Sequence, residues 1–260
     1  MAYTVVMAMN EIWGRRLGNF LSLDPDELGA LSRLSDGRVR RMSARMDLVR
    51  EGEPPQALRL ILSGWACRYR TLEDGRRQNL SILLPGDLCD LHDDVLPATD
   101  HAIGALTPLQ FVEIPFDKLE RLIESHPRLG RAFTWHMLTG VSAQREWIVN
   151  LSRSSLERLG NLFCELYYRL RAVGLTERDH FDFPMTQIEL AGATGLTSVH
   201  VNRTLQEMRA NQLIVLKNRR LVIPDIAALE HLVLFSRAFL HLDKGMTETG
   251  RVPAGAMLLS

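Results

Sequence analysis

Residues 185–209 read MTQIELAGATGLTSVHVNRTLQEMR, and this stretch predicts two short helices joined by a tight turn. Thr186 and Glu189 have the spacing of a capping box, in which each side chain binds the backbone amide of the other residue. Gly195 suits the left-handed turn after the first helix because it has no Cβ atom. Thr197 is a natural N-cap for the second helix. The arrangement is typical of a helix-turn-helix, which places its second helix in the major groove of DNA.

The second predicted helix spans residues 198–209, and its apolar residues recur at helical spacing. Val201, Leu205 and Met208 form the face that we expect to be buried, with Val201 filling the angle between the two helices. The opposite face and the start of such a helix meet the base edges of DNA. The candidate DNA contacts of the two helices are Thr186, Thr197, Ser198, Val199, His200, Asn202 and Arg203.

Two of these side chains have the chemistry for base recognition. Arg203 can donate two hydrogen bonds to guanine, and Asn202 can pair with adenine. His200 could contact a base or a phosphate, but a solvent-exposed surface residue is the simpler interpretation of a single histidine. For Arg203 we favour contact with DNA, because the capping box, the glycine turn and the helix spacing occur together.

A basic hairpin is predicted directly after the second helix. The apolar runs 213–216 and 221–223 flank Lys217-Asn218-Arg219-Arg220, which predicts two strands with a tight turn, or wing. Lys217, Arg219 and Arg220 are the candidate phosphate contacts. From residue 198 to residue 223 five lysines and arginines face one acid, Glu207. This local excess of positive charge is what phosphate contact requires.

The composition of the whole chain indicates a globular protein with a local, not a general, basic surface. The 260 residues suit two domains, and 46% of them are hydrophobic against 24% charged. The formal net charge is zero, which excludes a uniformly basic coat for nucleic acid. No apolar run approaches the ~20 residues that span a bilayer, and the first residues do not resemble a signal peptide. We therefore expect no membrane contact.

The cysteines and the absent motifs narrow the function further. Cys67, Cys89 and Cys164 are odd in number and far apart, so we expect neither disulfides nor a cysteine zinc site, and a cytoplasmic location. The chain has no GxxxxGK, HExxH or GxSxG motif. We expect no enzyme activity, no catalytic residue, no metal and no cofactor. The alternative from another class is an enzyme or scaffold whose winged helix mediates protein contacts.

The N-terminal part of the chain has the pattern of a β-roll. Short apolar runs such as 58–62 and 80–84 alternate with turns, and glycines at 52, 64, 75 and 86 are 11 or 12 residues apart. Asp74-Gly75 is a favourable hairpin turn. The β pattern continues to about Pro115. A short helix over 24–34 is predicted before it, capped by Asp24 with Pro25 in its first turn.

Two long helices are predicted between the roll and the helix-turn-helix. The first apolar stripe is Thr134, Met137, Val141, Gln144, Ile148 and Leu151, and the second is Leu156, Leu159, Phe163, Leu166, Leu170 and Val173. The first stripe predicts a dimer seam, or alternatively packing on the roll. The polar run 152–155 could be a hinge or an N-cap.

These patterns together predict an α+β protein in two domains. The predicted segments are a β-roll sensor over 20–125, a dimerisation helix and hinge over 126–153, a winged helix-turn-helix domain over 154–242, and a flexible tail over 243–260.

The order of β-roll, long helix and winged helix-turn-helix resembles the Crp/Fnr family of bacterial transcription regulators. The motifs that carry the resemblance are Glu51-Gly52-Glu53, Leu62-Ser63-Gly64, Asp74-Gly75, Leu84-Pro85-Gly86-Asp87, Met185-Thr186-Gln187, Gly195-Leu196-Thr197 and Val201-Asn202-Arg203. The resemblance implies a homodimer on a palindromic site in double-stranded DNA, a sensory roll, and RNA polymerase as a candidate partner. Arg203 matches the guanine-reading arginine of the family. Val199 stands where many members have glutamate, so the operator should differ from the common one.

The roll departs from the cyclic-nucleotide-binding members of that family. Those members have a Gly-Glu pair followed by an Arg-Ser or Arg-Thr pair, whereas this chain has Gly86-Asp87 and no arginine in the later stretch. Residues 87–102 contain five aspartates and no lysine or arginine, which would repel a phosphate. We therefore expect no binding of cyclic AMP in the family manner. The candidate effector pocket is Asp87, Leu88, Thr99 and Asp100, for an effector of unknown identity.

Other sensory chemistries of the family fit less well. The first 66 residues lack cysteine, which argues against an iron–sulfur cluster. A haem- or redox-responsive sensor stays an alternative through His92, His101, His126 or His136, or through Cys67 or Cys89. A metal site made of Asp90, His92, Asp93 and Asp94 is less simple than a solvated acidic loop.

Overall fold

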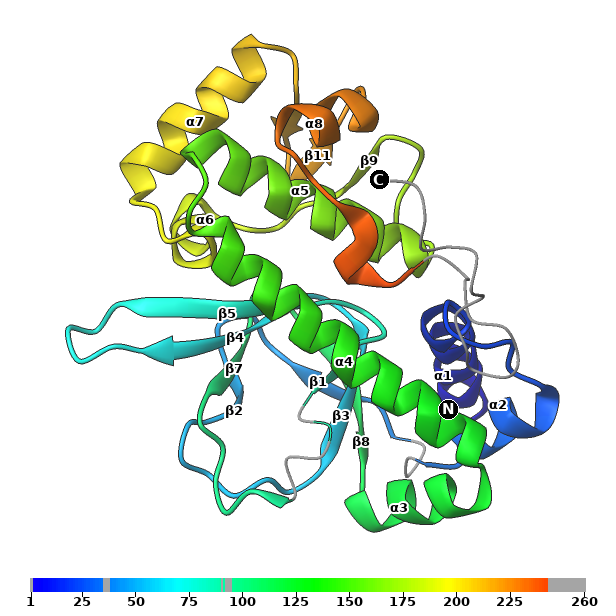
Figure 1. The fold of residues 1–260 in the computed structure, drawn as a ribbon. Coiled ribbons are helices and arrows are strands. Elements are labelled where there is room, and N and C mark those ends of the chain that lie inside the picture. Colours follow the sequence, from blue (N-terminus) through cyan, green and yellow to red (C-terminus); the bar gives the residue numbers. More distant parts are fainter. Residues whose placement is uncertain (1, 35–37, 90, 92–94, 243–260) are drawn as a thin grey trace.

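The N-terminal part of the chain is a β-roll made of two antiparallel sheets, as predicted (Figure 1). The computed structural model describes residues 2–34, 38–89, 91 and 95–242. The first sheet has the strand order β1-β8-β3-β6, and the second has the order β2-β7-β4-β5. The strands are β1 (Arg40–Met42), β2 (Asp47–Val49), β3 (Leu58–Ser63), β4 (Ala66–Thr71), β5 (Arg77–Leu83), β6 (Leu88–Cys89), β7 (Ala102–Ala105) and β8 (Leu109–Ile114).

The regularly spaced glycines of the roll all stand where the backbone has a positive φ. They are Gly52, Gly64, Gly75 and Gly86, with φ values of +86°, +89°, +81° and +89°. At Gly64 a Cβ atom would lie 2.3 Å from the carbonyl oxygen of Pro108, so no side chain fits there. The hairpin of β4 and β5 turns at Asp74-Gly75, which confirms the predicted turn. The spacing of these glycines therefore reflects the turns of the roll.

A helix for which the sequence pattern gives no signal precedes the roll. It is α1 (Ala2–Leu17), and it buries Trp13 and Leu17 completely. The edge of the Trp13 ring meets the ring of Phe133, with 5.6 Å between the ring centroids. The predicted opening helix follows as α2 (Pro25–Ser32), in which Asp24 and Glu27 form a capping box. The N-terminal residues thus belong to the core of the roll, ahead of its predicted start at residue 20.

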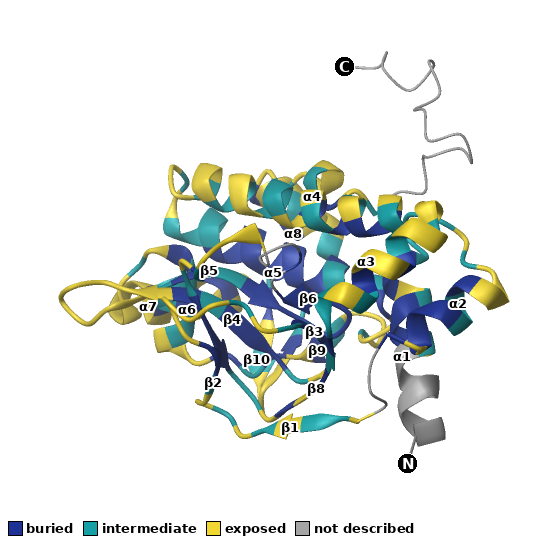
Figure 2. Ribbon diagram, turned by 90° about the horizontal axis from the view of Figure 1, so that it is seen from below, coloured by how far each residue is buried: buried dark blue, intermediate teal, exposed yellow. Residues whose placement is uncertain are grey.

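Three helices lead from the roll into the second domain (Figure 1). They are α3 (Phe116–Ser125), α4 (Pro127–Asn150) and α5 (Ser155–Ala172). Ser154 caps α5 by accepting from the backbone amide of Glu157, which confirms the predicted cap in the polar run. The second predicted stripe lies in α5 and is largely buried, whereas Ile148 of the first stripe is 69% exposed. Figure 2 shows α4 along one edge of the molecule with intermediate and exposed residues.

The C-terminal domain is built around α5. Its further elements are β9 (His180–Asp182), α6 (Gln187–Thr194), α7 (Ser198–Ala210), β10 (Val215–Lys217), β11 (Arg220–Val222), α8 (Ile226–Leu232) and the 3₁₀ helix η2 (Arg237–Leu240). No helix among the described residues is long and apolar enough to cross a membrane. The predicted flexible tail, residues 243–260, lies outside the described residues.

One hydrophobic core extends across both domains. Trp65, Tyr69 and Ile82 of the roll belong to the same buried cluster as Phe163 of α5 and Val201 of α7. The Trp65 ring meets the ring of Phe183, with 6.0 Å between centroids. Because apolar contact drives this packing, the roll holds the C-terminal domain in a defined position.

Candidate nucleic-acid interface

The first helix of the motif, α6, begins and ends at the predicted residues. Glu189 donates its backbone amide to Oγ1 of Thr186 at 3.3 Å, and Oε2 of Glu189 accepts from the amide of Thr186 at 2.6 Å. At the other end Gly195 has a φ of +66°, the left-handed conformation that the turn requires. The predicted capping box and the predicted glycine turn are both confirmed. Together they fix where the chain leaves α6 and enters α7.

The second helix, α7, separates a buried face from an exposed one. Thr197 caps it by accepting from the amide of His200 at 3.2 Å. Val201, Leu205 and Met208 are no more than 1% exposed, as predicted. The remaining positions near the start of α7 face solvent, and Val199 is 77% exposed. The exposed predicted contacts on α7 are Ser198, Val199, His200, Asn202 and Arg203.

The basic wing has the predicted tight turn and one strand more than predicted. Val215–Lys217 pairs with Arg220–Val222, and Asn218 and Arg219 have φ values of +52° and +56°, as a two-residue hairpin turn requires. The predicted two-stranded wing is corrected to a three-stranded sheet of order β10-β11-β9. The third strand pairs its Phe181 with Leu221, and both side chains are buried. Burial of this face holds the wing against the domain.

The charges at the wing are not equivalent. Arg220 lies 4.0 Å from Asp182, measured between Nε and Oδ1, so an acid balances part of its charge. Lys217 and Arg219 are exposed at the tip and have no ion pair within the described ranges. An exposed cation without an acid partner is freer to bind a phosphate oxygen. Lys217 and Arg219 are therefore better placed than Arg220 for that contact.

The four residues of the candidate effector pocket have different surroundings. Asp87 is buried between the guanidinium groups of Arg16 and Arg169, at 2.8 Å and 2.6 Å. Leu88 is also buried, and its amide donates to Nε2 of His136 at 3.2 Å. Thr99 instead donates its hydroxyl to backbone carbonyl oxygens of another loop. The side chain of Asp100 is 88% exposed and bonds to His101.

The charge balance at Asp87 also differs from the sequence-based expectation. The segment around Asp87 has no basic residue of its own, but Arg16 comes from α1 and Arg169 from α5. Burial alone would raise the pKa of Asp87, yet these two guanidinium groups lower it to about 2. Of the five aspartates on which the expected repulsion of phosphate rests, Asp87 therefore has its charge balanced by two arginines. The carboxylate is neutralised within the protein and occupied by its own arginines.

A buried network around Arg169 and a second contact between the domains have no counterpart in the sequence-based expectations. Arg169 also bonds Glu165 at 2.8 Å, and Glu165 accepts from Nε1 of Trp147 at 2.7 Å. Separately, Gln78 donates to the carbonyl oxygen of Gly192 at 2.8 Å, which joins the roll to α6. Arg169 and Glu165 are four residues apart on α5, but Asp87 is 82 positions from Arg169 and Gln78 is 114 positions from Gly192, so no local pattern marks the contacts between the domains.

The histidines named as candidate haem ligands that lie in the described residues each have a partner within the protein. His136 is buried and accepts from Leu88, while His101 and His126 bond to Asp100 and Asp26. No group of three or more metal-binding side chains occurs in the described part of the chain. The proposed acidic cluster, Asp90, His92, Asp93 and Asp94, lies outside the described residues.

The thiols are buried, as expected of unreactive cysteines. Cys67, Cys89 and Cys164 are buried, and the described residues contain no disulfide. Burial raises the pKa of Cys67 to about 12, and it also raises the pKa of Cys164. A thiol with a raised pKa carries little thiolate at neutral pH and reacts slowly with oxidants.

Family models match both domains. The model of the cyclic nucleotide-binding domain matches residues 39–126, and that of the Crp-like helix-turn-helix domain matches residues 157–232. The nitrogen fixation regulation protein FixK of Bradyrhizobium diazoefficiens is 30% identical over 213 residues, which cover 81% of this chain and 87% of that protein. The transcriptional activator protein FnrL of Cereibacter sphaeroides is 28% identical over 211 residues, covering 79% and 84%.

Solved structures share the fold. The structure of FixK2 from Bradyrhizobium japonicum superposes with a TM-score of 0.67 at 21% identity, covering 75% of this chain and 96% of that one. A transcriptional regulator of the CRP family from Thermus thermophilus, TTHB099, gives a TM-score of 0.57 at 20% identity, covering 76% and 97%.

Proposed function

Because the chain belongs to the Crp/Fnr family of transcription regulators, we propose that it binds a palindromic DNA operator as a homodimer. The observation that carries this proposal is that the exposed start of α7 and the basic tip of the wing belong to the same domain. A helix that buries Val201, Leu205 and Met208 presents its polar side to solvent, and the wing adds exposed cations to the same domain. The two half-sites would lie about one helical turn apart, or ~34 Å.

The contacts divide into base reading and phosphate binding. Arg203 would donate to guanine and Asn202 would pair with adenine, while Val199 would contact a thymine methyl group. The side-chain oxygen of Asn202 accepts from Nε2 of Gln187 at 3.5 Å, so binding adenine would replace a long hydrogen bond. Lys217, Arg219 and Arg220 would contact phosphates, together with the polar residues at the helix starts. Those residues are Thr186, Thr197, Ser198 and His200.

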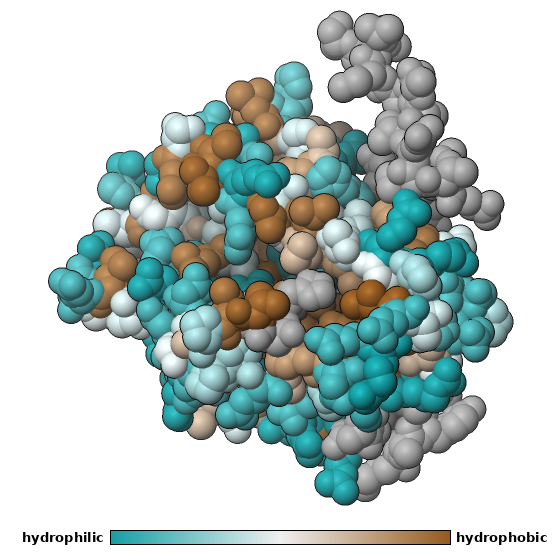
Figure 3. All heavy atoms as spheres, turned by 60° about the horizontal axis from the view of Figure 1, so that its bottom comes forward, coloured by the Kyte–Doolittle hydropathy of each residue, from teal (hydrophilic) through white to brown (hydrophobic). Residues whose placement is uncertain are grey.

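The dimer would form along the exposed side of α4. Ile148, Val149 and Leu151 are 69%, 51% and 51% exposed, and Leu138 earlier on the helix is 51% exposed. Figure 3 shows one face of the molecule, on which hydrophobic residues gather in several patches between hydrophilic ones. An apolar stripe on a long helix is usually covered by a partner, and a second copy of the helix has the matching spacing.

The three segments of the chain would have separate tasks. We assign sensing to residues 20–125 with α1 packed against them, dimerisation to 126–153, and DNA binding to 154–242. The roll would not bind cyclic AMP in the family manner, since Asp87 is already bound by Arg16 and Arg169. The protein would act in the cytoplasm, where bacterial DNA and RNA polymerase are found.

A signal in the roll would reach the DNA through the junction of α4 and α5. Arg158 donates to the carbonyl oxygens of Leu151 and Thr194, at the end of α4 and at the end of α6. Arg153 beside it pairs with Glu146 of α4 at 2.7 Å and bonds Asn161 of α5. This junction would have two alternative conformations. A signal that favours one of them over the other would reorient α6 and α7.

Selection of bound duplexes from a random DNA pool, with purified protein and no added ligand, tests the proposal. We expect a palindromic consensus with guanine at the position that Arg203 reads. Enrichment of a sequence without two-fold symmetry would refute the dimeric mode. No enrichment, either alone or with a cell extract supplying small molecules, would refute sequence-specific binding. Calorimetry with cyclic AMP tests the roll separately, and tight binding would overturn that part.

A further inference from the structure

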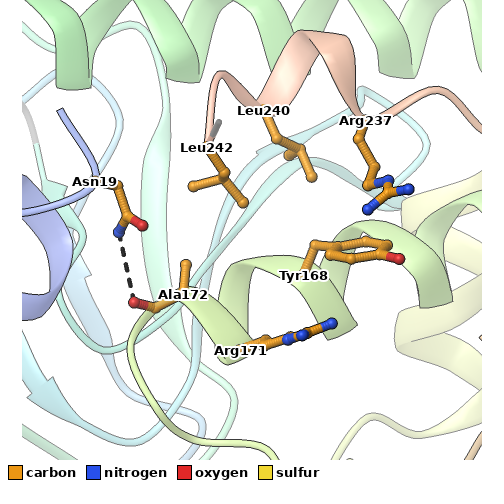
Figure 4. A pocket seen from close by; sticks show the side chains of 7 residues that line it. All are labelled: Asn19, Tyr168, Arg171, Ala172, Arg237, Leu240 and Leu242. Carbon is orange, nitrogen blue, oxygen red and sulfur yellow. Dashed lines mark hydrogen bonds between the residues drawn. The ribbon is translucent and has the colours of Figure 1, made fainter. Parts of the chain in front are cut away.

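A hollow of about 360 Å³ lies where the N-terminal region meets the C-terminal domain (Figure 4). Its lining comes from three distant parts of the chain: Asn19 after α1, the end of α5, and η2 with the residues after it. The lining residues are Asn19, Tyr168, Arg171, Ala172, Arg237, Leu240 and Leu242. The volume lies within the roughly 300–1,000 Å³ that is typical of small-molecule sites. None of the DNA-contacting residues proposed above lines it.

The charged part of the lining consists of two arginines and no acid. Arg237 lies over the ring of Tyr168, with its Cζ atom 5.0 Å from the ring centroid, and Arg171 lies on the other side of Tyr168 in the view of Figure 4. Glu230 is 3.5 Å from Nε of Arg237 and balances part of that charge. The side chain of Arg171 has no ion pair or hydrogen bond within the part of the chain that the structure describes. One positive charge therefore remains without a counter-charge at the hollow.

The rest of the lining is apolar and held in place. Leu240, Leu242 and Ala172 provide a hydrocarbon wall beside the arginines. Tyr168 is fixed by a stack on Phe235, with rings 7° from parallel and centroids 6.0 Å apart. The carbonyl oxygen of Ala172 accepts from Nδ2 of Asn19 at 3.4 Å, and Arg15 donates to that of Val173 at 2.8 Å. These bonds satisfy carbonyl oxygens at the end of α5 that would otherwise repel an anion.

We propose that this hollow binds a small amphipathic organic anion, a carboxylate attached to a hydrocarbon body. The guanidinium group of Arg171, which has no counter-charge, would hold the carboxylate, because a planar guanidinium group donates paired hydrogen bonds to it, and Arg237 would add positive charge from across Tyr168. The hydrocarbon body would lie against Leu240 and Leu242. A ligand in this position would contact the N-terminal region and the DNA-binding domain at once. The proposal concerns a site outside the roll and does not depend on DNA binding.

The test uses the fluorescent anion anilinonaphthalene sulfonate and the full chain without DNA. We expect saturable binding that Arg171→Gln and Arg237→Gln each weaken about tenfold, through loss of one charge-assisted contact. Ala172→Leu should also weaken it, because the longer side chain fills the hollow without changing its charge. The matched control is Arg41→Gln, which removes an exposed arginine at a different hollow of about 340 Å³ on the roll. This control should bind the dye like the unaltered protein.

Competition defines the ligand class. Decanoate should displace the dye, whereas decanol lacks the charge and inorganic phosphate lacks the hydrocarbon, so neither should compete. Equal binding by the two arginine variants and the unaltered protein would overturn the proposal. So would an equal loss in Arg41→Gln, or displacement by decanol as effective as by decanoate. Since no DNA is present, a failure of this site leaves the proposed operator binding untouched.

Discussion

The Nη2 atom of Arg169 in α5 lies 2.6 Å from Oδ2 of Asp87, which joins the C-terminal domain to the roll through a buried ion pair. Arg16 of α1 binds the other oxygen of the same carboxylate at 2.8 Å. Leu84 completes the site by donating its amide to Asp87 at 2.8 Å. Three segments of the chain therefore meet at a single carboxylate, and its removal should weaken the packing of all three.

Asp87→Asn should lower the free energy of unfolding by about 3–5 kcal/mol, because it leaves two buried guanidinium groups without their carboxylate. Urea denaturation at neutral pH measures the change. The control is Asp117→Asn, which breaks a 2.6 Å pair with Arg121 whose side chains are 61% and 65% exposed. That exposed pair should contribute little to the free energy of unfolding, because water screens both charges. Equal effects of the two substitutions would show that the buried pair does not hold the domains together.

His136 should make the protein less stable as the pH falls. Burial, reinforced by the charge of Arg16, lowers the pKa of His136 from 6.5 to about 3. Between these values the unfolded chain binds a proton that the folded chain does not. The stabilisation is therefore complete above pH 6.5 and is lost progressively towards pH 3, by about 1.4 kcal/mol per pH unit.

Unfolding of His136→Gln at several values between pH 6 and pH 4 checks this dependence. Glutamine keeps an acceptor for the amide of Leu88 but does not titrate, so the variant should show a correspondingly flatter slope. The exposed His231 provides the control. If His231→Gln flattened the slope as much as His136→Gln, the buried imidazole would not be the source.

Ile148→Glu should separate the proposed dimer. Each copy would bury an unpaired carboxylate in the seam, which should raise the dissociation constant by about two orders of magnitude or more. Sedimentation velocity over a range of concentrations measures it. Val95→Glu is the matched control, since Val95 lies in the roll and is 79% exposed. A dissociation constant that Ile148→Glu leaves unchanged would mean that the two copies meet at another surface. A protein that is monomeric without the substitution would mean that no dimer forms along α4.

Arg203→Ala and Arg219→Ala should weaken DNA binding in different ways. Loss of Arg203 should cost ~1–3 kcal/mol and relax the sequence preference at one base position. Loss of Arg219 should weaken binding to all duplexes alike and reduce the salt dependence by about one counterion. Binding isotherms at several salt concentrations, on the selected operator and on its single-base variants, separate the two. Identical patterns for both variants would contradict the assigned roles.

The parts of this protein that sequence could predict are those encoded by neighbouring residues. The capping box of Thr186, the turn at Gly195 and the cap at Thr197 each depend on atoms a few positions apart. The same holds for the turns of the roll and for the cap of α2. The apolar spacing of α7 likewise predicts its exposed side, because burial alternates with the period of the helix.

The parts that sequence could not predict depend on distant partners. Arg169 and Asp87 are 82 positions apart, so no sequence pattern near either residue predicts their ion pair. The burial of α1 depends on Phe133 of α4, and β9 is a strand only because β11 lies beside it. The surroundings of the candidate effector residues also depend on distant partners, since Asp87 binds Arg16 and Arg169 and Thr99 donates to the carbonyl oxygen of Arg50.

The core that Trp65 and Tyr69 share with α5 has a consequence for evolution and for engineering. Regulators of this architecture suggest an exchange of domains, in which the sensor of one protein is fused to the DNA-binding domain of another. Here the boundary between the exchanged domains would pass through one continuous hydrophobic core, and it would separate Gln78 from Gly192. A functional chimaera would need to take the contacting strands of the roll from the same protein as the DNA-binding domain. Related proteins that acquire new operators are therefore expected to change the surface of α7 and to keep the interface between the roll and the C-terminal domain unaltered.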